Sequence, residues 1–412
     1  MRVRPYAVSR PALAVLLTAV IAGVVAGCSG SPARSSSAST SSAPAPATGT
    51  PAPSATSTVT PLNCAETLFG QLTPEQRIGQ LLMAGFDTNA PLTSLDDEIG
   101  TGHVGNVIYL GGWNGAEKVR RTSEHLQALV SQDATGGIGL MISADQEGGI
   151  VHQLRGSGFT QPPTALAQAS MRPAALTTAA TAWAKELRAV GVNVNLAPVT
   201  DTVPADIGTG NEPIGKWGRQ YGADPAVVSR AAVAFLKGMR AGGVEGTVKH
   251  FPGLGRIQRN TDFNATGITD SVATTTDPHL APFAAGIEAG AGLVMVSSAR
   301  YPKLDAKNAA MFSPAIIDGL LRTQLGFDGV VITDDLNAAA AKVLPVAERA
   351  VKYVGAGGDI LLTGAPEAAA PMAKALAAAA TSPDFAEKLD ASVLRVLTLK
   401  ERMGLLPCSA TP

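Results

Sequence analysis

The chain contains the stretch Gly329-Val330-Val331-Ile332-Thr333-Asp334-Asp335, a short apolar run that ends in two adjacent carboxylates. A run of apolar and β-branched residues bounded by glycine predicts a buried strand. Asp334 and Asp335 follow at the C-terminal end of that strand. This stretch therefore predicts a strand that carries charged side chains to one edge of a sheet.

Similar runs recur from about residue 62 onward, each followed by a glycine or polar loop and a segment of helical period. Strands are predicted over Gly79–Phe86, Gly105–Leu110, Leu140–Ala144, Val192–Pro198, Gly246–His250, Gly292–Ser297, Gly329–Thr333 and Asp359–Thr363. Helices are predicted over Thr177–Ala189, Pro225–Ala241, Leu280–Ala289, Pro314–Gln324 and Ala347–Val354. Eight alternating strands predict an α/β fold with a single (β/α)8 TIM-type barrel. A doubly wound sheet is the alternative, but no Gly-rich phosphate fingerprint follows the first strand.

Ionisable residues stand at the C-terminal ends of four predicted strands. These residues are Asp145, Asp201, the pair Lys249-His250 and the pair Asp334-Asp335. In a barrel, strand ends of this kind meet at one mouth, where catalysis occurs. Buried charges are costly unless they are paired or functional, so the four groups together predict an enzyme that acts on a polar substrate.

The composition excludes several other classes of protein. A net charge of −1 over 412 residues gives no electrostatic footprint for nucleic acid. Aromatic residues make up only 4% of the chain, which argues against a stacking platform for bases. No cluster of His and Cys has metal-binding spacing, so we predict neither a metal nor another cofactor.

The N-terminal region predicts export. Residues 1–27 combine the basic Arg2 and Arg4 with an apolar stretch over 11–27 that is short for a membrane-spanning helix. The stretch ends in Val25-Ala26-Gly27-Cys28, which resembles a bacterial lipobox and predicts a lipid on Cys28. An ordinary signal peptide with an incidental cysteine is the alternative. Residues 28–61 are rich in Ser, Ala, Pro and Thr and predict a disordered tether, so the folded domain is expected over 62–412.

Two further cysteines, Cys64 and Cys408, lie at the two ends of the expected domain. In an oxidising compartment they can form a disulfide that closes a very long loop. Two unpaired, partly buried thiols are the alternative.

Four motifs give the chain a resemblance to glycoside hydrolase family 3. The motifs are Asp145-Gln146-Glu147-Gly148-Gly149, Asn195-Leu196-Ala197-Pro198-Val199, Lys249-His250-Phe251-Pro252-Gly253 and the segment 326–336, which ends in Thr333-Asp334-Asp335-Leu336. Within that family, the chain is most similar to bacterial β-N-acetylglucosaminidases that act on peptidoglycan fragments. The resemblance extends over roughly residues 66–405.

The resemblance implies roles for individual residues. It implies that Asp334 is the nucleophile, an ionised carboxylate that forms a covalent glycosyl-enzyme. Asp145, Lys249, His250 and Arg219 match positions that contact sugar hydroxyls. From its position we expect Asp335 to cap the helix that follows the strand.

The loop after Lys249–Gly253 departs from the family pattern. The N-acetylglucosaminidase branch carries an Asp-Ser/Thr-His triplet there, whose histidine is the general acid/base. Here the triplet is Asn260-Thr261-Asp262. In one interpretation Asp262 is itself the acid/base, with a pKa raised by burial and by Asp334, and Asn260 donates a hydrogen bond to it. In the other, the acid has been lost, and the protein is a slow enzyme or a sugar-binding relic.

Other features bear on the substrate. Gln153 stands where the family often has arginine, and we expect it to contact the sugar. A second carboxylate at the reaction centre would repel phosphate, so the sequence predicts hydrolysis and not phosphorolysis. The resemblance implies an enzyme that removes terminal β-linked GlcNAc from glycans, and the N-terminal region predicts that it is anchored on the outer face of the cytoplasmic membrane. The alternatives are a β-glucosidase or β-xylosidase of the same family, and a lipoprotein that only binds glycans.

Overall fold

A parallel barrel lies at the centre of the computed structural model, which describes residues 63–409. Its eight strands follow one another around the sheet in chain order. They are β1 (Leu82–Asp87), β2 (Asn106–Leu110), β4 (Met141–Ala144), β8 (Val194–Asn195), β9 (Glu245–Phe251), β10 (Leu293–Val296), β11 (Val330–Thr333) and β12 (Leu361–Thr363). All the pairs are parallel, and β12 pairs with β1. Between β11 and β12, a bridge from Ile332 to Ile360 closes the ring, which confirms the (β/α)8 barrel.

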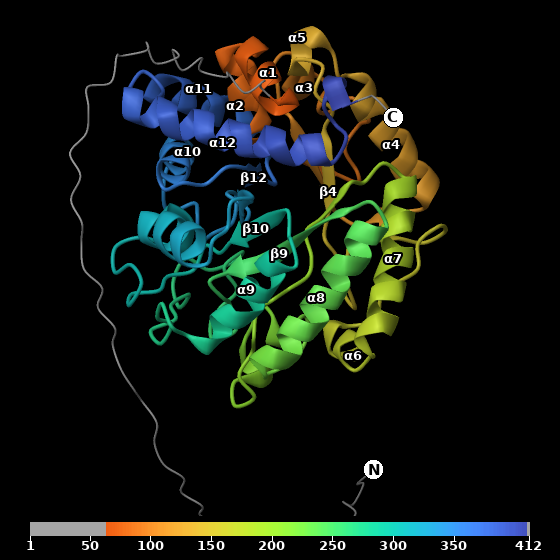
Figure 1. The fold of residues 1–412 in the computed structure, drawn as a ribbon, viewed down its shortest axis with the longest axis vertical. Coiled ribbons are helices and arrows are strands. Elements are labelled where there is room, and N and C mark those ends of the chain that lie inside the picture. The colour runs from red at the N-terminus through yellow and green to blue at the C-terminus, as the bar shows by residue number, and fades with distance from the viewer. Residues whose placement is uncertain (1–62, 410–412) are drawn as a thin grey trace, which may run out of the picture. The chain divides into compact units, whose positions relative to one another are not determined.

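Helices surround the barrel, as Figure 1 shows. Those that follow the barrel strands are α3 (Asp96–Gly100), α4 (Ala116–Ala128), α5 (Gln132–Thr135), α6 (Ala165–Ala169), α7 (Pro173–Ala189), α8 (Pro225–Ala241), α9 (Ala281–Glu288), the π-helix Ala315–Gln324, α10 (Val346–Gly355), α11 (Ala369–Ala379) and α12 (Pro383–Arg402). Before β1 lie α1 (Cys64–Gln71) and α2 (Pro74–Gln80), and beyond the barrel are the short strands β3 (Trp113–Asn114), β5 (Gln146–Gly148), β6 (Val151–His152) and β7 (Leu154–Arg155).

The eight predicted strands and five predicted helices are all present, although several of their bounds shift by a few residues, and three elements differ in start, length or type. The first strand begins at Leu82, because a capping box of Thr73 and Gln76 starts a helix that continues to Gln80. The fourth strand contains only Val194 and Asn195. The helix Ala315–Gln324 is a π-helix, which hydrophobic spacing alone does not distinguish from an α-helix.

The barrel strands are apolar because both of their faces are buried. Every residue of β4, β10, β11 and β12 is buried. Strands covered by the ring of helices outside and by side-chain layers inside have no exposed face to carry polar residues. Their C-terminal ends are therefore the places where this barrel can present charged side chains to solvent.

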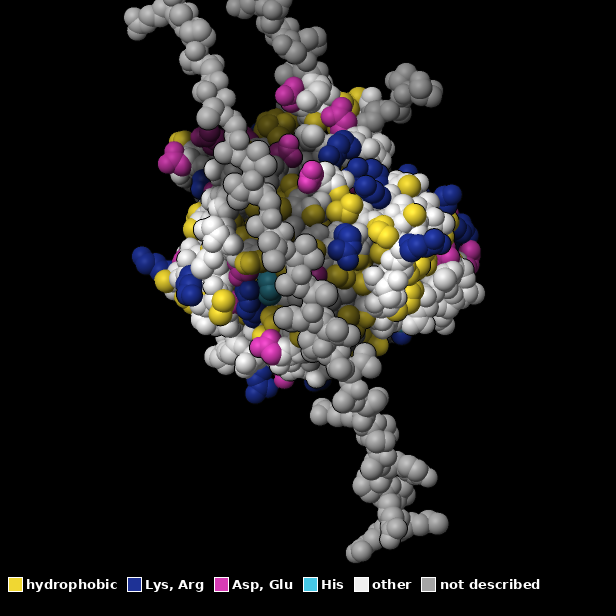
Figure 2. Space-filling model, turned by 60° about the horizontal axis from the view of Figure 1, so that its bottom comes forward, with side chains coloured by type: hydrophobic (Ala, Val, Ile, Leu, Met, Phe, Trp, Pro, Cys, Tyr) yellow, Lys and Arg dark blue, Asp and Glu magenta, His cyan; other side chains and the backbone are white. Residues whose placement is uncertain are grey.

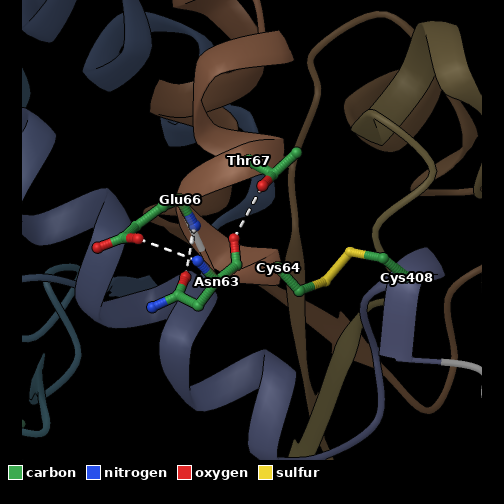
Figure 3. Close-up of a disulfide and its surroundings, with 5 residues drawn as sticks. All are labelled: Asn63, Cys64, Glu66, Thr67 and Cys408. Carbon is green, nitrogen blue, oxygen red and sulfur yellow. Dashed lines mark hydrogen bonds between the residues drawn. A yellow bond between two sulfur atoms is a disulfide. The ribbon is translucent and has the colours of Figure 1, made fainter. Parts of the chain in front are cut away.

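A disulfide between Cys64 and Cys408 joins the beginning and the end of the described chain, with a Cα separation of 6.0 Å (Figure 3). This is the pairing that the sequence suggested. Next to it, Asn63 and Glu66 form a capping box that begins α1. The lipidation expected on Cys28 lies outside the described residues.

The surface carries charges of both signs, as the face in Figure 2 shows. Acidic and basic side chains are interspersed there with hydrophobic and uncharged ones. Among residues 63–409, no helix is both long and apolar enough to span a membrane.

Candidate active site

Side chains from the ends of several barrel strands line a cavity of about 300 Å³. Its ionisable lining residues are Asp145, Arg219, Lys249, His250, Asp262, Asp334 and Asp335. The volume lies at the small end of the range for ligand pockets. Six of the seven come from the strand ends and the loop that the sequence singled out, and the seventh, Arg219, comes from the loop between β8 and α8.

A buried ion network forms one wall of this cavity. Lys249 is 1% exposed, and its Nζ atom lies 2.6 Å from Asp145 and 2.7 Å from Glu147. Arg219 donates to the same Glu147 from Nε at 2.9 Å and from Nη2 at 2.7 Å, and it donates from Nη1 to the Pro213 carbonyl. Burial alone would raise the pKa of Glu147, but Arg219 and Lys249 lower it to about 2. Glu147 therefore stays ionised and fixes the position of both cations.

A second buried pair holds His250 at the end of β9. Its Nδ1 atom lies 2.7 Å from Oδ2 of Asp201, which is fully buried. The carboxylate of Asp201 also accepts the backbone N–H groups of His250 and Leu254. The Nε2 atom of His250 has no partner among residues 63–409 and is therefore available to a ligand in the cavity. The peptide bonds Lys249–His250 and Phe251–Pro252 are cis.

Asp334 and Asp335 follow β11 but have different surroundings. Asp334 accepts the backbone N–H of Asp335 at 2.9 Å and lines the cavity. Asp335 accepts the N–H groups of Asn337 and Gly364. No helix begins directly after Asp335, because the next one starts only at Val346. The expected helix cap is therefore wrong, and Asp335 organises a turn instead.

The loop between β9 and α9 brings Asp262 to the same cavity. Two backbone hydrogen bonds, from Ala339 N–H to the Asp262 carbonyl and from Ala340 N–H to the Thr261 carbonyl, join the loop to the segment after β11. The side-chain oxygen of Asn260 accepts the backbone N–H of Asp262 at 2.8 Å. Asn260 thus shapes the loop and does not donate to the Asp262 carboxylate as the sequence suggested.

The pKa values of Asp262 and Asp334 are both raised above that of an ordinary aspartate. For Asp262, which keeps contact with solvent, partial desolvation is the largest cause, opposed by Arg219 and His250 and supported by Asp335 and Asp145. For Asp334, burial is again the largest cause, and the nearby charge of Asp262 adds to it. Because an ionised Asp262 raises the pKa of Asp334, the site favours a state in which only one of these two carboxyl groups is ionised.

Gln153 is the predicted site residue that the structure does not bring into the cavity. Its side-chain oxygen accepts the backbone N–H of Gly112 at 3.0 Å, and it is not among the residues that line the cavity. Conversely, the sequence assigned Glu147 no role of its own, although it lies two positions after Asp145 in a motif that the sequence singled out. Asp201 was named only as a charged strand end, and its contact with His250 was not foreseen.

The site is built from carboxylates, cations and an imidazole, without a metal-binding cluster. Within residues 63–409, no group of three or more His, Cys, Asp or Glu side chains is arranged to hold a metal ion. Acid/base and nucleophilic chemistry by paired carboxylates is what this side-chain set can perform directly. A closed parallel barrel with such a cavity at its strand ends defines the chain as a barrel enzyme for polar substrates.

Comparison with known proteins gives the family. The model of the glycosyl hydrolase family 3 N terminal domain matches residues 73–399, so the chain belongs to glycoside hydrolase family 3. It is therefore a glycoside hydrolase.

Several relatives carry more specific names. The crystal structure of a β-N-acetylhexosaminidase from Beutenbergia cavernae is 47% identical, with a TM-score of 0.78, and the match covers 80% of this chain and 98% of that one. A family 3 β-N-acetylglucosaminidase from Paenibacillus is 34% identical, with a TM-score of 0.71, over 83% of this chain and 64% of that one. A β-hexosaminidase from Stenotrophomonas maltophilia is 36% identical over 234 residues, which are 55% of this chain and 68% of the relative.

Proposed function

We propose that the protein is a retaining exo-β-N-acetylglucosaminidase that hydrolyses terminal β-linked GlcNAc. The observation that carries the proposal is that Asp334 and Asp262, from two hydrogen-bonded segments, line one small cavity. Retaining glycosidases use two carboxylates in this way. The β-N-acetylhexosaminidases among the relatives support the choice of an amino sugar, and the small cavity suits one terminal sugar residue.

In the first step, ionised Asp334 attacks the anomeric carbon and forms a covalent ester with the sugar. The glycosidic C–O bond breaks, and its oxygen takes a proton from Asp262. In the second step, Asp262, now ionised, removes a proton from water. The water oxygen attacks the same carbon, the ester bond breaks, and Asp334 is regenerated.

The raised pKa values of the two carboxyl groups support a pair that shares one proton. For Asp334, burial is the largest cause and Asp262 adds to it, whereas His250 and Lys249 lower the pKa. For Asp262, desolvation is the largest cause, opposed by Arg219 and His250 and supported by Asp335 and Asp145. The raised pKa of Asp262 moves it toward the pH at which a general acid is useful.

The surrounding ions keep free hydrogen-bonding capacity for the sugar hydroxyls. The ammonium group of Lys249 has three N–H donors, of which Asp145 and Glu147 occupy two. Asp145 accepts Lys249 on Oδ1 and keeps Oδ2 for a hydroxyl. The Nε2 atom of His250 is free, and Arg219 retains N–H groups beyond those given to Glu147 and Pro213. These residues are rigidly held before substrate binds, which reduces the cost of binding.

The acceptor in the second step is proposed to be water. Asp262, which is ionised in this step, lines the cavity as a second carboxylate, and its charge repels a phosphate ion but not a neutral water molecule.

We also propose that the enzyme acts outside the cytoplasm, held at the membrane by a lipid on Cys28, on peptidoglycan fragments. Mass spectrometry of the mature N-terminus, with membrane fractionation of Cys28→Ala, tests the anchor.

One set of assays tests the activity. The wild type, Asp334→Asn and Asp262→Asn are compared on aryl β-GlcNAc, aryl β-glucoside and aryl β-xyloside. We expect hydrolysis of aryl β-GlcNAc, loss of activity in Asp334→Asn, and a trapped glycosyl-enzyme on activated substrates in Asp262→Asn. Faster cleavage of a glucoside or xyloside would identify a different glycosidase. No cleavage of any aryl glycoside would favour a glycan-binding role, and unchanged rates in Asp262→Asn would remove Asp262 from the mechanism.

A further inference from the structure

An ion cluster lies in the loop between β9 and α9, and none of its members lines the active-site cavity. The guanidinium group of Arg256 donates to both carboxylate oxygens of Asp277, from Nη1 at 2.6 Å and from Nη2 at 2.9 Å. Its Nη1 atom also donates to Oδ2 of Asp270 at 3.2 Å. The side chains of Asp270 and Asp277 are 3% and 5% exposed, and that of Arg256 is 17% exposed. Fork-shaped, charge-assisted contacts that are largely shielded from water are among the stronger polar contacts in proteins.

The cluster joins the two ends of the loop segment that carries Asp262. Arg256 stands six positions before Asp262, whereas Asp270 and Asp277 stand eight and fifteen positions after it. The ion pairs of Arg256 therefore close the chain between them into a loop, and the cluster forms the neck of that loop.

The exit side of this neck is part of the packed barrel. Oδ1 of Asp277 accepts the backbone N–H of His279 at 2.9 Å and so begins the 3-10 helix Pro278–Leu280, which continues into α9. In α9, the ring of Phe283 packs edge-on against Phe251 of β9, with 5.3 Å between the ring centroids. Asp277 thus offers Arg256 an acceptor whose position is fixed by a packed helix.

The entry side of the neck lies directly beside the active-site cavity. Leu254, two residues before Arg256, lines the cavity, and so do residues 260–262. The side-chain amide of Asn211 donates to the backbone carbonyls of Leu254 and Ile257, on both sides of Arg256. A displacement of Arg256 would therefore be passed along the backbone to two sections of the cavity wall.

The position of the Asp262 carboxylate depends on the backbone of this loop. Among residues 63–409, no donor forms a hydrogen bond with that carboxylate, whereas the backbone N–H and carbonyl of Asp262 bind Asn260 and Ala339. A general acid must stand within about 3 Å of the oxygen that it protonates. A misplacement of about 1 Å can cost about 100-fold in rate, so the loop must be held in place for Asp262 to act.

We infer that Arg256 is a positioning residue, whose ion pairs with Asp270 and Asp277 hold Asp262 in the cavity that it shares with Asp334. The inference rests on the proposed function, because it takes Asp262 as the general acid/base. Arg256 does not line the cavity and therefore acts on the reaction only through the position of Asp262.

Two substrates separate this role from an effect on folding alone. Phenyl β-GlcNAc has a poor leaving group and needs a proton from the acid, whereas dinitrophenyl β-GlcNAc has a good leaving group and needs none. Arg256→Met should lower kcat/KM for the phenyl glycoside about tenfold, a part of the roughly 100- to 10,000-fold that a general acid contributes, and change that for the dinitrophenyl glycoside less than about twofold. A smaller folded fraction would lower both values by the same factor.

The second step of the reaction gives an independent readout. Asp262 also removes the proton from water when the glycosyl-enzyme is hydrolysed, and this step limits kcat when the leaving group is good. On the dinitrophenyl glycoside, kcat and KM should therefore fall together in Arg256→Met. Loss of folded enzyme alone lowers kcat and leaves KM unchanged.

Two conservative variants test whether the ion pairs are responsible. Arg256→Lys keeps the charge but not the fork-shaped contact, so it should recover part of the loss. Asp277→Asn keeps an oxygen for the N–H of His279 and should therefore fold, and it should show the same pattern as Arg256→Met to a smaller degree. The double variant Arg256→Met/Asp277→Asn should lose no more than Arg256→Met, because both changes remove one contact.

Arg259→Gln is the matched control, since Arg259 belongs to the same loop, is 61% exposed and pairs with Glu212 at 3.3 Å. It should keep the wild-type values on both glycosides. Equal losses on the two glycosides in Arg256→Met and Asp277→Asn, or no loss on either, overturn the inference and leave the proposed function intact if Asp262→Asn still affects the phenyl glycoside more. If Asp262→Asn affects both glycosides equally, then Asp262 is not the acid, and the proposed mechanism and the inference fail together.

Discussion

Asp201 holds His250 through a 2.7 Å contact between Oδ2 and Nδ1, and its other oxygen accepts the backbone N–H of Leu254 at 2.6 Å. One buried carboxylate therefore fixes both the imidazole and the start of the loop that leads to Asp262. The contact places the proton of His250 on Nδ1 and directs Nε2 to the cavity. Asp201→Asn can keep the backbone contact, but its amide group would face Nδ1 and disfavour this tautomer.

We expect Asp201→Asn to lower kcat/KM on aryl β-GlcNAc by about 10- to 100-fold, the range of a charge-assisted hydrogen bond. Nitrogen NMR of His250 should show an altered distribution of the proton between Nδ1 and Nε2. If the tautomer changes and the kinetics do not, then His250 does not contact the sugar in the way proposed.

Asp334 should reduce the stability of the free enzyme at neutral pH. Its pKa in the folded protein is raised from 3.8, mainly by burial, so the unfolded chain ionises more readily than the folded one. Ionisation therefore destabilises the fold as pH rises through and above 3.8. Asp334→Asn should be inactive and yet more stable at pH 7 by about 1 kcal/mol, a rise of a few degrees in Tm.

Differential scanning calorimetry at pH 7 and again below pH 3.8 checks this expectation, because the gain should disappear once the wild-type carboxylate is protonated. Asp328→Asn is the matched control, an exposed aspartate just before the same strand. A gain in Asp328→Asn as large as that in Asp334→Asn would assign the effect to net charge instead of burial.

Glu147 should have the opposite effect on stability. Its pKa is lowered from 4.5 to about 2 by Arg219 and Lys249, despite burial. The stability it contributes is thus complete above pH 4.5 and is lost as pH falls toward 2. Glu147→Gln leaves two buried cations without their shared partner, so we expect a loss of about 3–5 kcal/mol at pH 7.

Urea unfolding as a function of pH measures this loss. Below pH 4.5 the wild type and Glu147→Gln should converge. The control is Glu348→Gln, which removes the exposed ion pair with Lys352 and should cost no more than about 1 kcal/mol. A constant difference between the wild type and Glu147→Gln at all pH values would show that Glu147 acts by packing alone.

The sequence predicted the barrel because its strands are buried on both faces and therefore stand out as apolar runs. Val330–Thr333 is typical: all four residues are buried, and glycine and aspartate mark its ends. The residues at the strand ends were found for the same reason, since a charge directly after an apolar run has few structural explanations. β8 was overestimated because the residues after Asn195 are buried without belonging to a strand.

Details that depend on tertiary contacts could not be predicted. Gln153 follows Asp145 by eight positions, but a hydrogen bond from Gly112, far away in sequence, draws its side chain out of the cavity. Asn260 was expected to donate to Asp262, yet the loop bends so that its oxygen accepts the Asp262 backbone N–H. In both cases the direction of the side chain depends on the path of the backbone, which residue spacing does not determine.

The disulfide between Cys64 and Cys408 should stabilise the domain, because it closes a loop with a sequence separation of 344 residues. Disulfides typically contribute about 2–4 kcal/mol by restricting the unfolded chain. We expect Cys408→Ser to lower Tm by several degrees, and a reducing agent to lower the Tm of the wild type to the same value. Equal Tm values for the wild type with and without reductant would contradict a stabilising role for this bond.

The identity of the acid/base can be tested by restoring the triplet that the resemblance to N-acetylglucosaminidases led us to expect. In Asn260→Asp/Asp262→His, an imidazolium near Asp334 would replace the carboxyl group of Asp262 as the proton donor. A general acid must be protonated, so activity falls as pH rises through its pKa. Because free histidine has a pKa of about 6.5 and free aspartate about 3.9, the basic limb of the pH profile should move to higher pH.

The same variant should also accept phosphate better, since it removes a negative charge from the reaction centre. Sugar-1-phosphate, measured in phosphate buffer by NMR, should be absent with the wild type and detectable with the variant. Asp262→Asn is the control for the pH profile, because it removes the same charge without supplying an acid. Its activity on activated substrates should therefore show no fall at high pH. A basic limb at the same pH in the wild type, the double variant and Asp262→Asn would mean that the proton comes from another residue, and Asp262 would then have no place in the chemistry.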